Sequence, residues 1–338
     1  MTASRPARST SARRIAATVG VAAFALASTA CAPGGGGDDA AASDSYPDRN
    51  IEVVVPFAAG GPTDTVTRLV GDPMSQELGV QMIVQNVEGA GGTVGAGEVA
   101  NAKNDGYTLL MHHIGMSTAP TLYEDLAYDP VEDFEPIGLV TEVPMTIIAR
   151  GDLEPKSLEE LFAYLEENAG DVTLANAGVG SASHLCGRLI QQELGIELQE
   201  VPYDGAAPAI ADLVGGQVDV MCDQTTNTTG QIEGGDVQAY AVTTPERVES
   251  LPDLPTTAEA GFPGVEVAVW HALYAPAGTP DAVVEKLRGS LATALEDQAV
   301  IDQMASLGTA PVAAEDVQPE AVTTTLNEQI DLWGDVLS

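Results

Sequence analysis

Residues Ile51–Val70 of this chain have the sequence IEVVVPFAAGGPTDTVTRLV. A run of β-branched apolar residues ends at Phe57, a glycine pair follows, and Pro62–Asp64 has the pattern of a helix start. This order turns unpaired backbone N–H groups and the positive end of a helix dipole toward one point. No Lys or Arg stands before Arg68, so main-chain donors would hold an anion here. Ordinary packing of a strand against a helix is the alternative.

The first 30 residues predict an export signal. Arginines up to Arg14 precede the apolar run Ile15–Ala27, which is too short to span a bilayer. Cys31 stands where a bacterial lipoprotein signal places its acylated cysteine, although Ser replaces the commoner Leu three positions earlier. Residues 31–46 are rich in glycine and small polar side chains and predict a flexible tether. We expect an extracytoplasmic protein whose contact with the cell membrane is a lipid on Cys31; a disordered basic tail is the alternative.

The composition excludes several classes of protein. The 338 residues include 50 acidic and 13 basic side chains, for a formal net charge of −37. Because phosphate contacts need a basic face, nucleic-acid binding is not expected. No stretch after the signal has the length of a membrane span, so the chain is not predicted to be a channel or permease. The remaining chain of about 290 residues suits two lobes better than one core.

Strand and helix signals alternate from residue 50 onward, which predicts an α/β fold with largely parallel strands. Two extended stretches, 137–149 and 265–275, carry no helix signals and are the natural crossings between lobes. The predicted division is lobe one at residues 48–145 and 270–338, and lobe two at 146–269.

The chain has no motif that argues for catalysis, a cofactor or a metal. Gly89–Gly95 has the spacing G-x-G-G-x-x-G, and the next strand ends in His112-His113 where dinucleotide binding would need an acid. The four histidines show no metal-binding spacing, and no G-x-S-x-G is present. We therefore predict a protein that is not an enzyme.

A second strand–glycine–helix pattern lies at Gly178–His184, with the sequence GVGSASH. If the two glycine turns belong to opposite lobes, the cleft between them can close on a small anion. His184 is the histidine that we favour as a ligand contact for this reason. The cysteines Cys186 and Cys222 form either a disulfide or two separately buried thiols, and spacing alone does not choose between them.

Short motifs recur in a fixed order along the chain. They are VPFAAGGPTD at 55–64, GAGGTVG at 89–95, DGYTL at 105–109, GVGSASHL at 178–185, VPY at 201–203, GGQVDV at 215–220, LPTTAEAG at 254–261 and APAGTP at 275–280. Together they resemble the solute-binding receptors of tripartite tricarboxylate transporters, the TctC or Bug family, over residues 47–338. The resemblance implies a two-lobed type II periplasmic-binding-protein fold. It also implies a monomeric receptor that delivers a small carboxylate to the small and large membrane subunits of a permease.

The resemblance also assigns ligand contacts to both glycine loops. The expected contacts are Phe57, Ala59, Gly60, Gly61, Thr63, His113, Asn176, Gly178, Ser181, Ser183, His184 and Asp223. Asp223, placed after a strand predicted at 218–221, would accept from a substrate hydroxyl, amine or water; a solvated turn aspartate is the alternative. Asp64 is interpreted as complementing the helix dipole, because a carboxylate would repel a bound carboxylate.

Two departures from the family pattern suggest altered ligand choice. His112 stands where a small residue is commoner, and Asp204 stands where we expect Lys or Arg. If His112 lines the cleft, ligand affinity should change between about pH 5.5 and 7.5. Two other functions remain open from sequence: a ligand sensor for a membrane signalling partner, and a structural surface protein without a ligand.

Overall fold

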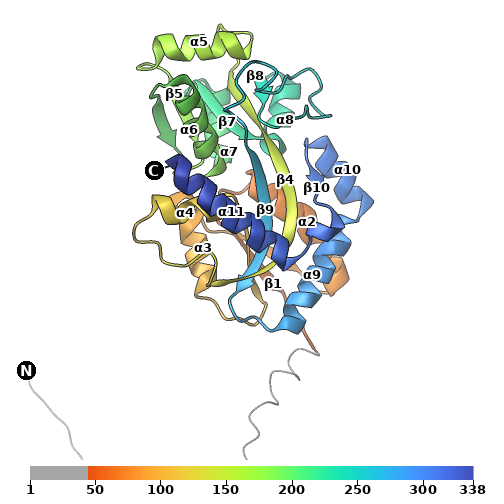
Figure 1. Ribbon diagram of the computed structural model, residues 1–338. Coiled ribbons are helices and arrows are strands. Elements are labelled where there is room, and N and C mark those ends of the chain that lie inside the picture. The colour runs from red at the N-terminus through yellow and green to blue at the C-terminus, as the bar shows by residue number, and fades with distance from the viewer. Residues whose placement is uncertain (1–44, 338) are drawn as a thin grey trace, which may run out of the picture. The chain divides into compact units, whose positions relative to one another are not determined.

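The computed structural model describes residues 45–337, so the signal segment, Cys31 and nearly all of the tether lie outside the described residues. The described part contains a ten-stranded mixed sheet with helices packed around it (Figure 1). The strands are β1 (Ile51–Val55), β2 (Met82–Asn86), β3 (Thr108–His113), β4 (Phe134–Arg150), β5 (Thr173–Asn176), β6 (Gln199–Pro202), β7 (Val220–Gln224), β8 (Val237–Val242), β9 (Ala268–Pro276) and β10 (Ala310–Pro311).

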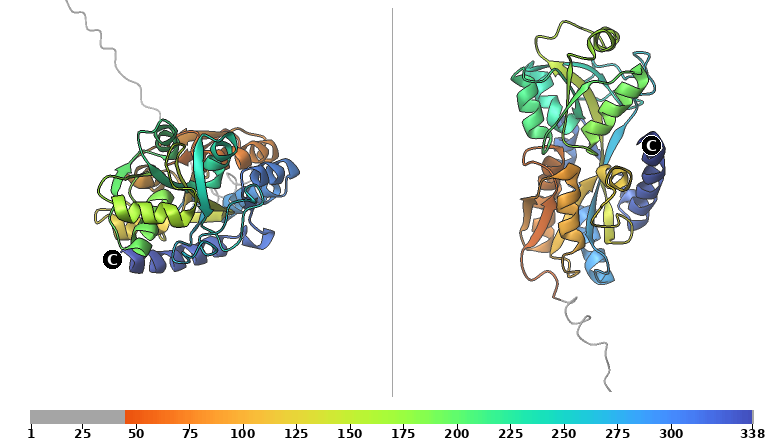
Figure 2. Two further views of the ribbon diagram at one scale, coloured as in Figure 1. Left: turned by 90° about the horizontal axis from the view of Figure 1, so that it is seen from above. Right: turned by 90° about the vertical axis from the view of Figure 1, so that its left-hand side faces the viewer.

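The helices follow the strands in the predicted alternation. They are α2 (Pro62–Leu78), α3 (Thr93–Ala100), α4 (Gly115–Leu122), α5 (Leu158–Asn168), α6 (Ala182–Leu194), α7 (Ala206–Val214), α8 (Thr225–Gly234), α9 (Asp281–Leu295), α10 (Gln298–Ser306) and α11 (Pro319–Leu337). The last helix, α11, packs against α4 and β4 (Figure 2). No helix within residues 45–337 has both the length and the apolar character needed to cross a membrane.

Strand β4 links two halves of the sheet because it changes partners along its length. Its first part pairs with β9 as far as Pro144, and its last part, from Met145, pairs with β7 and β8. The two extended stretches predicted as crossings are thus the strands β4 and β9. Both run through the middle of the sheet in Figure 1.

The sheet departs from the sequence prediction in two respects. Parallel pairing is confined to β1–β2, β1–β3, β5–β6 and β5–β7, whereas β4, β8, β9 and β10 pair antiparallel. Strands β4 and β9 run in opposite directions and pair with each other, so the middle of the sheet is antiparallel. The strand predicted at 218–221 is β7 at Val220–Gln224, so Asp223 lies within a buried strand and not in a turn after it.

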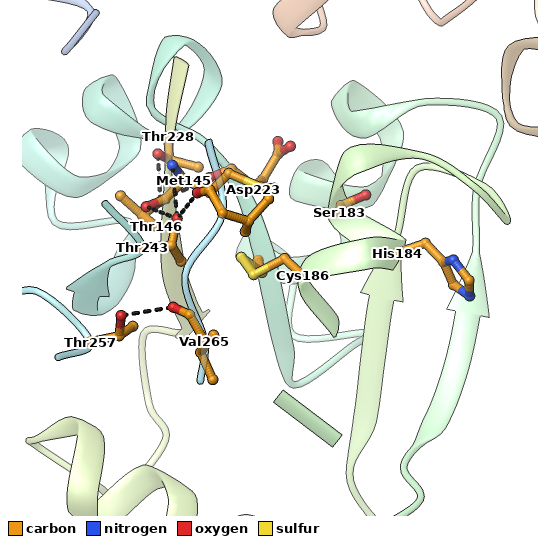
Figure 3. Close-up of a disulfide and its surroundings, with 12 residues drawn as sticks. Met145, Thr146, Ser183, His184, Cys186, Asp223, Thr228, Thr243, Thr257 and Val265 are labelled. Carbon is orange, nitrogen blue, oxygen red and sulfur yellow. Dashed lines mark hydrogen bonds between the residues drawn. A yellow bond between two sulfur atoms is a disulfide. The ribbon is translucent and has the colours of Figure 1, made fainter. Parts of the chain in front are cut away.

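A disulfide joins Cys186 on α6 to Cys222 on β7, with the two Cα atoms 6.0 Å apart. Of the two arrangements left open by sequence, the structure has the bonded one. Cys186 lies one turn after the start of α6, and Cys222 lies next to Asp223 (Figure 3). The bond therefore fixes the first turn of α6 against the end of β7.

We expect the Cys186→Ala/Cys222→Ala double variant to lose about 3–4 kcal/mol of unfolding free energy, because the bond closes a loop with a sequence separation of 36 residues. Urea unfolding of the variant and of wild type, with and without reductant, measures this loss. Reductant should lower the wild-type midpoint and leave that of the variant unchanged. Equal midpoints for oxidised wild type and variant would contradict the prediction.

Candidate functional site

A small buried pocket lies where the two halves of the sheet meet. Its lining comes from both glycine loops and from β3 and β7: Phe57, Pro62, Thr63, His113, Ala177, Ser181, Ala182, Ser183, Ala206, Asp223 and Gln224. The centre of a water molecule can reach only about 10 Å³ of it, which is room for about one water. No Lys or Arg is among the lining residues.

Four helices begin at this pocket. Helix α2 starts at Pro62, α6 at Ala182 and α7 at Ala206, and Gln224 is the residue that caps the N-terminus of α8. The first turn of a helix carries N–H groups without intrahelical acceptors and the positive end of the helix dipole. Four such ends converging on one space without a basic side chain make an environment suited to an anion.

The loop from β1 to α2 is held by Asp64. Its carboxylate accepts hydrogen bonds from the Gly60 N–H at 2.9 Å, from Nε and Nη2 of Arg68 at 2.9 and 2.8 Å, and from Asn86 Nδ2 at 3.1 Å. Burial raises the pKa of Asp64, but these hydrogen bonds outweigh burial and leave the pKa below its ordinary value. Asp64 thus neutralises the one nearby cation and shapes the loop.

The N–H groups of both glycines in this loop have acceptors within the loop. The Gly60 N–H donates to Asp64, and the Gly61 N–H donates to the Ala58 carbonyl at 3.2 Å. In this structure neither N–H is free for a ligand, and their role as ligand contacts stays a prediction. Ala59 does not line the pocket either, and of the predicted contacts in this loop only Phe57 and Thr63 reach it.

The second loop supplies serine hydroxyls and a helix start. Ser183 Oγ accepts from the Ala177 N–H at 2.7 Å and lies 3.1 Å from Ser181 Oγ. Asn176 and Gly178 do not line the pocket: Asn176 Oδ1 accepts from the Gly178 N–H at 3.0 Å and so shapes the turn. Ser181 and Ser183 are the predicted residues of this loop that reach the pocket.

His184 does not line the pocket in this structure, so its role as a ligand contact stays a prediction. Its Nδ1 accepts from the Gly180 N–H at 3.2 Å, and its Nε2 lies 3.5 Å from a Glu200 carboxylate oxygen. Figure 3 shows its ring on the side of α6 away from Asp223. Successive residues of a helix point about 100° apart, so Ser183 and His184 do not share a face.

Three histidines pack behind the pocket. His113 lines it, stacks on Phe57 with ring centroids 4.5 Å apart, and contacts His112 and His271 edge to face. His112 does not line the pocket, and burial together with the charge of His271 lowers its pKa to about 3. Titration of His112 between pH 5.5 and 7.5 is therefore not expected. Asp204 is exposed and is not among the lining residues, so neither departure from the family pattern lines the pocket in this structure.

Asp223 and Gln224 end strand β7 at the pocket. Asp223 is fully buried, its Oδ2 accepts from Asn227 Nδ2 at 2.6 Å, and burial raises its pKa to about 7. Within the described residues, Oε1 of Gln224 has no hydrogen-bond partner. The β7 end of the pocket thus presents acceptors, whereas the helix starts present donors.

Five lining residues are absent from the expected contacts: Pro62, Ala177, Ala182, Ala206 and Gln224. Ala206 follows a glycine at a helix start, which is the same signal that marked the first two loops. Gln224 directly follows Asp223 and caps α8, a helix that was not predicted from the sequence. Within residues 45–337, no group of three or more His, Cys, Asp and Glu side chains is placed to hold a metal ion.

We expect Asp64→Asn to lower the unfolding free energy by about 2 kcal/mol at pH 7, since it weakens charge-assisted hydrogen bonds at a buried position. Because the pKa of Asp64 is lowered in the folded state, this stabilisation is present above the unfolded-state pKa and is lost as pH falls through the folded-state pKa. The difference from wild type should therefore shrink below about pH 4. Urea unfolding at several pH values measures it.

The control for this variant is Asp72→Asn, an exposed aspartate on the same helix, which should change stability by less than about 0.5 kcal/mol. Equal effects of the two substitutions would show that Asp64 does not hold the loop.

Comparison with known proteins places the chain in a family. The model of the tripartite tricarboxylate transporter family receptor, TctC, matches residues 66–337. The solved periplasmic binding protein BugD is 51% identical with a TM-score of 0.84, covering 86% of this chain and 97% of that one. MatC from Rhodopseudomonas palustris, solved with malate, is 40% identical with a TM-score of 0.84, covering 87% and 100%.

A further R. palustris protein, solved with adipate, is 32% identical with a TM-score of 0.82 and covers 86% of this chain and 97% of its own. These relatives are solute-binding proteins of the periplasmic-binding-protein type and not enzymes. The match covers most of the described residues. This chain therefore belongs to the TctC family of tripartite tricarboxylate transporter receptors.

Proposed function

We propose that this chain captures a small carboxylate outside the cytoplasm and delivers it to the small and large membrane subunits of a tripartite permease. The observation that carries the proposal is the convergence of the starts of α2, α6, α7 and α8 on one buried pocket without Lys or Arg. That two relatives are solved with malate and with adipate supports a carboxylate as the anion.

The contacts that we assign to the ligand follow from the lining of the pocket. The N–H groups at the first turns of α2 and α6, near Thr63 and Ser183, would bind one carboxylate, and Ser181 would add a hydroxyl. Phe57 and His113 would pack against the carbon chain. Burial together with the charges of His112 and His271 lowers the pKa of His113 well below its ordinary value, so His113 acts as a neutral group.

Binding requires the two halves to move apart, because a pocket with room for about one water cannot hold malate or adipate. We propose lobes at 48–145 with 270–338 and at 146–269, joined through β4 and β9. In this structure the lobes touch closely: Tyr123 Oη donates to the Val179 carbonyl at 2.7 Å, and Thr118 Oγ1 donates to the Gly180 carbonyl at 3.1 Å. The ligand-bound form would keep these contacts between the lobes around a larger pocket, and the ligand would favour that form by gaining donors from both lobes.

The absence of a side chain at Gly91 allows the two lobes to come this close. Its φ is +62°, and a Cβ there would lie 1.8 Å from the Val179 carbonyl oxygen of the other lobe. A side chain at position 91 therefore opposes this close approach of the lobes. It also has a cost within its own lobe, because φ is positive and the Cβ would lie 2.9 Å from Tyr123 Oη.

The proposal extends to the N-terminus, where acylation of Cys31 would keep the receptor at the membrane that holds its permease. A membrane anchor raises the concentration of the loaded receptor near that permease. Labelling with a radioactive fatty acid, compared between wild type and Cys31→Ser, tests the anchor independently of ligand binding.

We expect one or more of malate, succinate, adipate, citrate and aspartate to raise the melting temperature of residues 32–338, with glucose inactive. A ligand at 100 times its dissociation constant stabilises the protein by about 2.7 kcal/mol. Ala206→Leu should abolish this rise because Ala206 lines the pocket, whereas Ala211→Leu, on the exposed face of the same helix, should preserve it. Absence of any carboxylate response, after co-purified ligand is removed, would contradict the receptor function and favour a structural role.

If the ligand-bound form keeps the contact between Gly91 and Val179, Gly91→Ala should weaken binding of the best carboxylate at least tenfold, about 1.4 kcal/mol. The control is Gly97→Ala within α3, where a Cβ meets only ordinary contacts at 3.8 Å. Isothermal titration measures both affinities. Equal affinities for the two variants would show that the Gly91 contact is not part of the ligand-bound form.

A further inference from the structure

Asp223 is a buried acid in a pocket otherwise arranged for an anion. It is 1% exposed, it lies on β7 opposite Thr146 of β4, and its Oδ2 accepts from Asn227 Nδ2 at 2.6 Å. The contacts assigned to a bound carboxylate in the proposed function make no use of Asp223.

Within residues 45–337, no cationic side chain neutralises Asp223. Strand β7 packs against α6, α7, α8, β4 and β5. The titratable side chains on these elements are His184, Arg188 and Glu193 on α6, Asp212 on α7, Glu233 on α8, and Glu135, Glu142 and Arg150 on β4, with none on β5. None of them contributes to the pKa of Asp223, which is set by burial and by hydrogen bonds from Asn227 and the Gln224 backbone.

The charged groups of the other lobe do not neutralise Asp223 either. His113 shares the pocket with Asp223, but burial and its histidine neighbours keep it uncharged. Arg68 on α2 is engaged by both carboxylate oxygens of Asp64. A bound carboxylate would therefore meet an ionised Asp223 without a compensating positive side chain.

Two ionised carboxylates in one buried site repel each other strongly, because the low effective dielectric constant of a protein interior screens their charges poorly. Proteins avoid such repulsion by protonating one of the two groups. A protonated Asp223 would keep one oxygen for the Asn227 amide and turn the other into an O–H donor.

We propose that binding of a carboxylate at this pocket is coupled to the uptake of one proton from solvent, which Asp223 holds as a neutral carboxylic acid in the complex. The inference rests on the proposed function and adds a residue that selects between ligands. A purely anionic ligand takes up a proton on binding. A ligand with an ammonium group beside Asp223 would pair with the ionised form instead and release a proton.

The pKa of about 7 for Asp223 in the free protein makes the coupling measurable near neutrality. Below pH 7 Asp223 is already mostly protonated, so affinity for a fully ionised dicarboxylate should be nearly flat. Above pH 7 each binding event must take up a proton, so affinity should fall with rising pH, by up to tenfold per unit. Protonation of Asp223 in the complex means that its pKa there is higher than in the free protein. The fall of affinity continues until the pH exceeds that higher pKa.

The test is isothermal titration with malate, succinate or adipate, using the one of the three that binds best, from about pH 6 to 8.5. At pH 8, titration in phosphate and in Tris separates the heat of buffer ionisation and gives the number of protons taken up. We expect a value approaching one for wild type, and a dissociation constant that rises from pH 7 to 8.5. Asp223→Asn should bind without net proton uptake and with a flat pH profile.

The matched control is Asp171→Asn, an exposed aspartate before β5, which should keep the wild-type pH profile. Urea unfolding at pH 8 checks that Asp223→Asn is folded; it should be at least as stable as wild type, since it removes a buried charge. A flat or rising affinity with pH in wild type, or an unchanged pH profile in Asp223→Asn, would overturn the inference while leaving carboxylate binding intact. Failure of all three probes to bind would overturn the proposed function and the inference with it.

Discussion

The proposed function depends on the starts of four helices meeting at one buried pocket that has no basic side chain. The nearest cation on the first loop, Arg68, is bound by Asp64, and none of the pocket-lining residues is Lys or Arg. The positive potential for an anion would then come from backbone N–H groups and helix dipoles, each of which acts only within about the first turn of its helix. The convergence of the four helix starts is therefore the feature on which the proposed site rests.

Several features of the scaffold produce this convergence. Parallel strands place the starts of α2, α6 and α7 at the carboxyl edge of the sheet, because each helix follows a strand. The disulfide fixes the first turn of α6 against β7, next to Asp223. The pairing of β4 with both halves lets the two sets of helix starts face each other. Gly205 allows the start of α7 to approach Ala58, where a Cβ would lie 2.6 Å from the Ala58 side chain.

Sequence predicted the helix starts well because their signals are local. Strand, glycine turn and capping residues occur within a few positions, so α2 and α6 begin within one residue of where the patterns placed them. Ser157 and Glu160 likewise have the local spacing of a capping box, and Ser157 caps α5 by accepting from the Glu160 N–H.

The individual contacts could not be predicted in the same way, because they depend on partners distant in sequence or on side-chain direction. The Gly60 N–H is taken by Asp64, whose orientation also depends on Asn86 from another strand. His184 turns toward Glu200, and Ser183, one residue earlier, faces the pocket. The family pattern identified Asp223 and placed it after a strand predicted at 218–221. In the structure β7 extends to Gln224, so Asp223 is buried within the strand.

The most direct test of this account is a crystal structure of residues 32–338 with malate or adipate bound. The account predicts a ligand carboxylate within hydrogen-bond distance of backbone N–H groups at the first turns of α2 and α6, with no Lys or Arg side chain in contact. It also predicts a pocket larger than in the present structure. A ligand bound elsewhere, such as the larger surface groove of about 690 Å³ beside Trp270 and Trp333, or a carboxylate paired with an arginine, would contradict it.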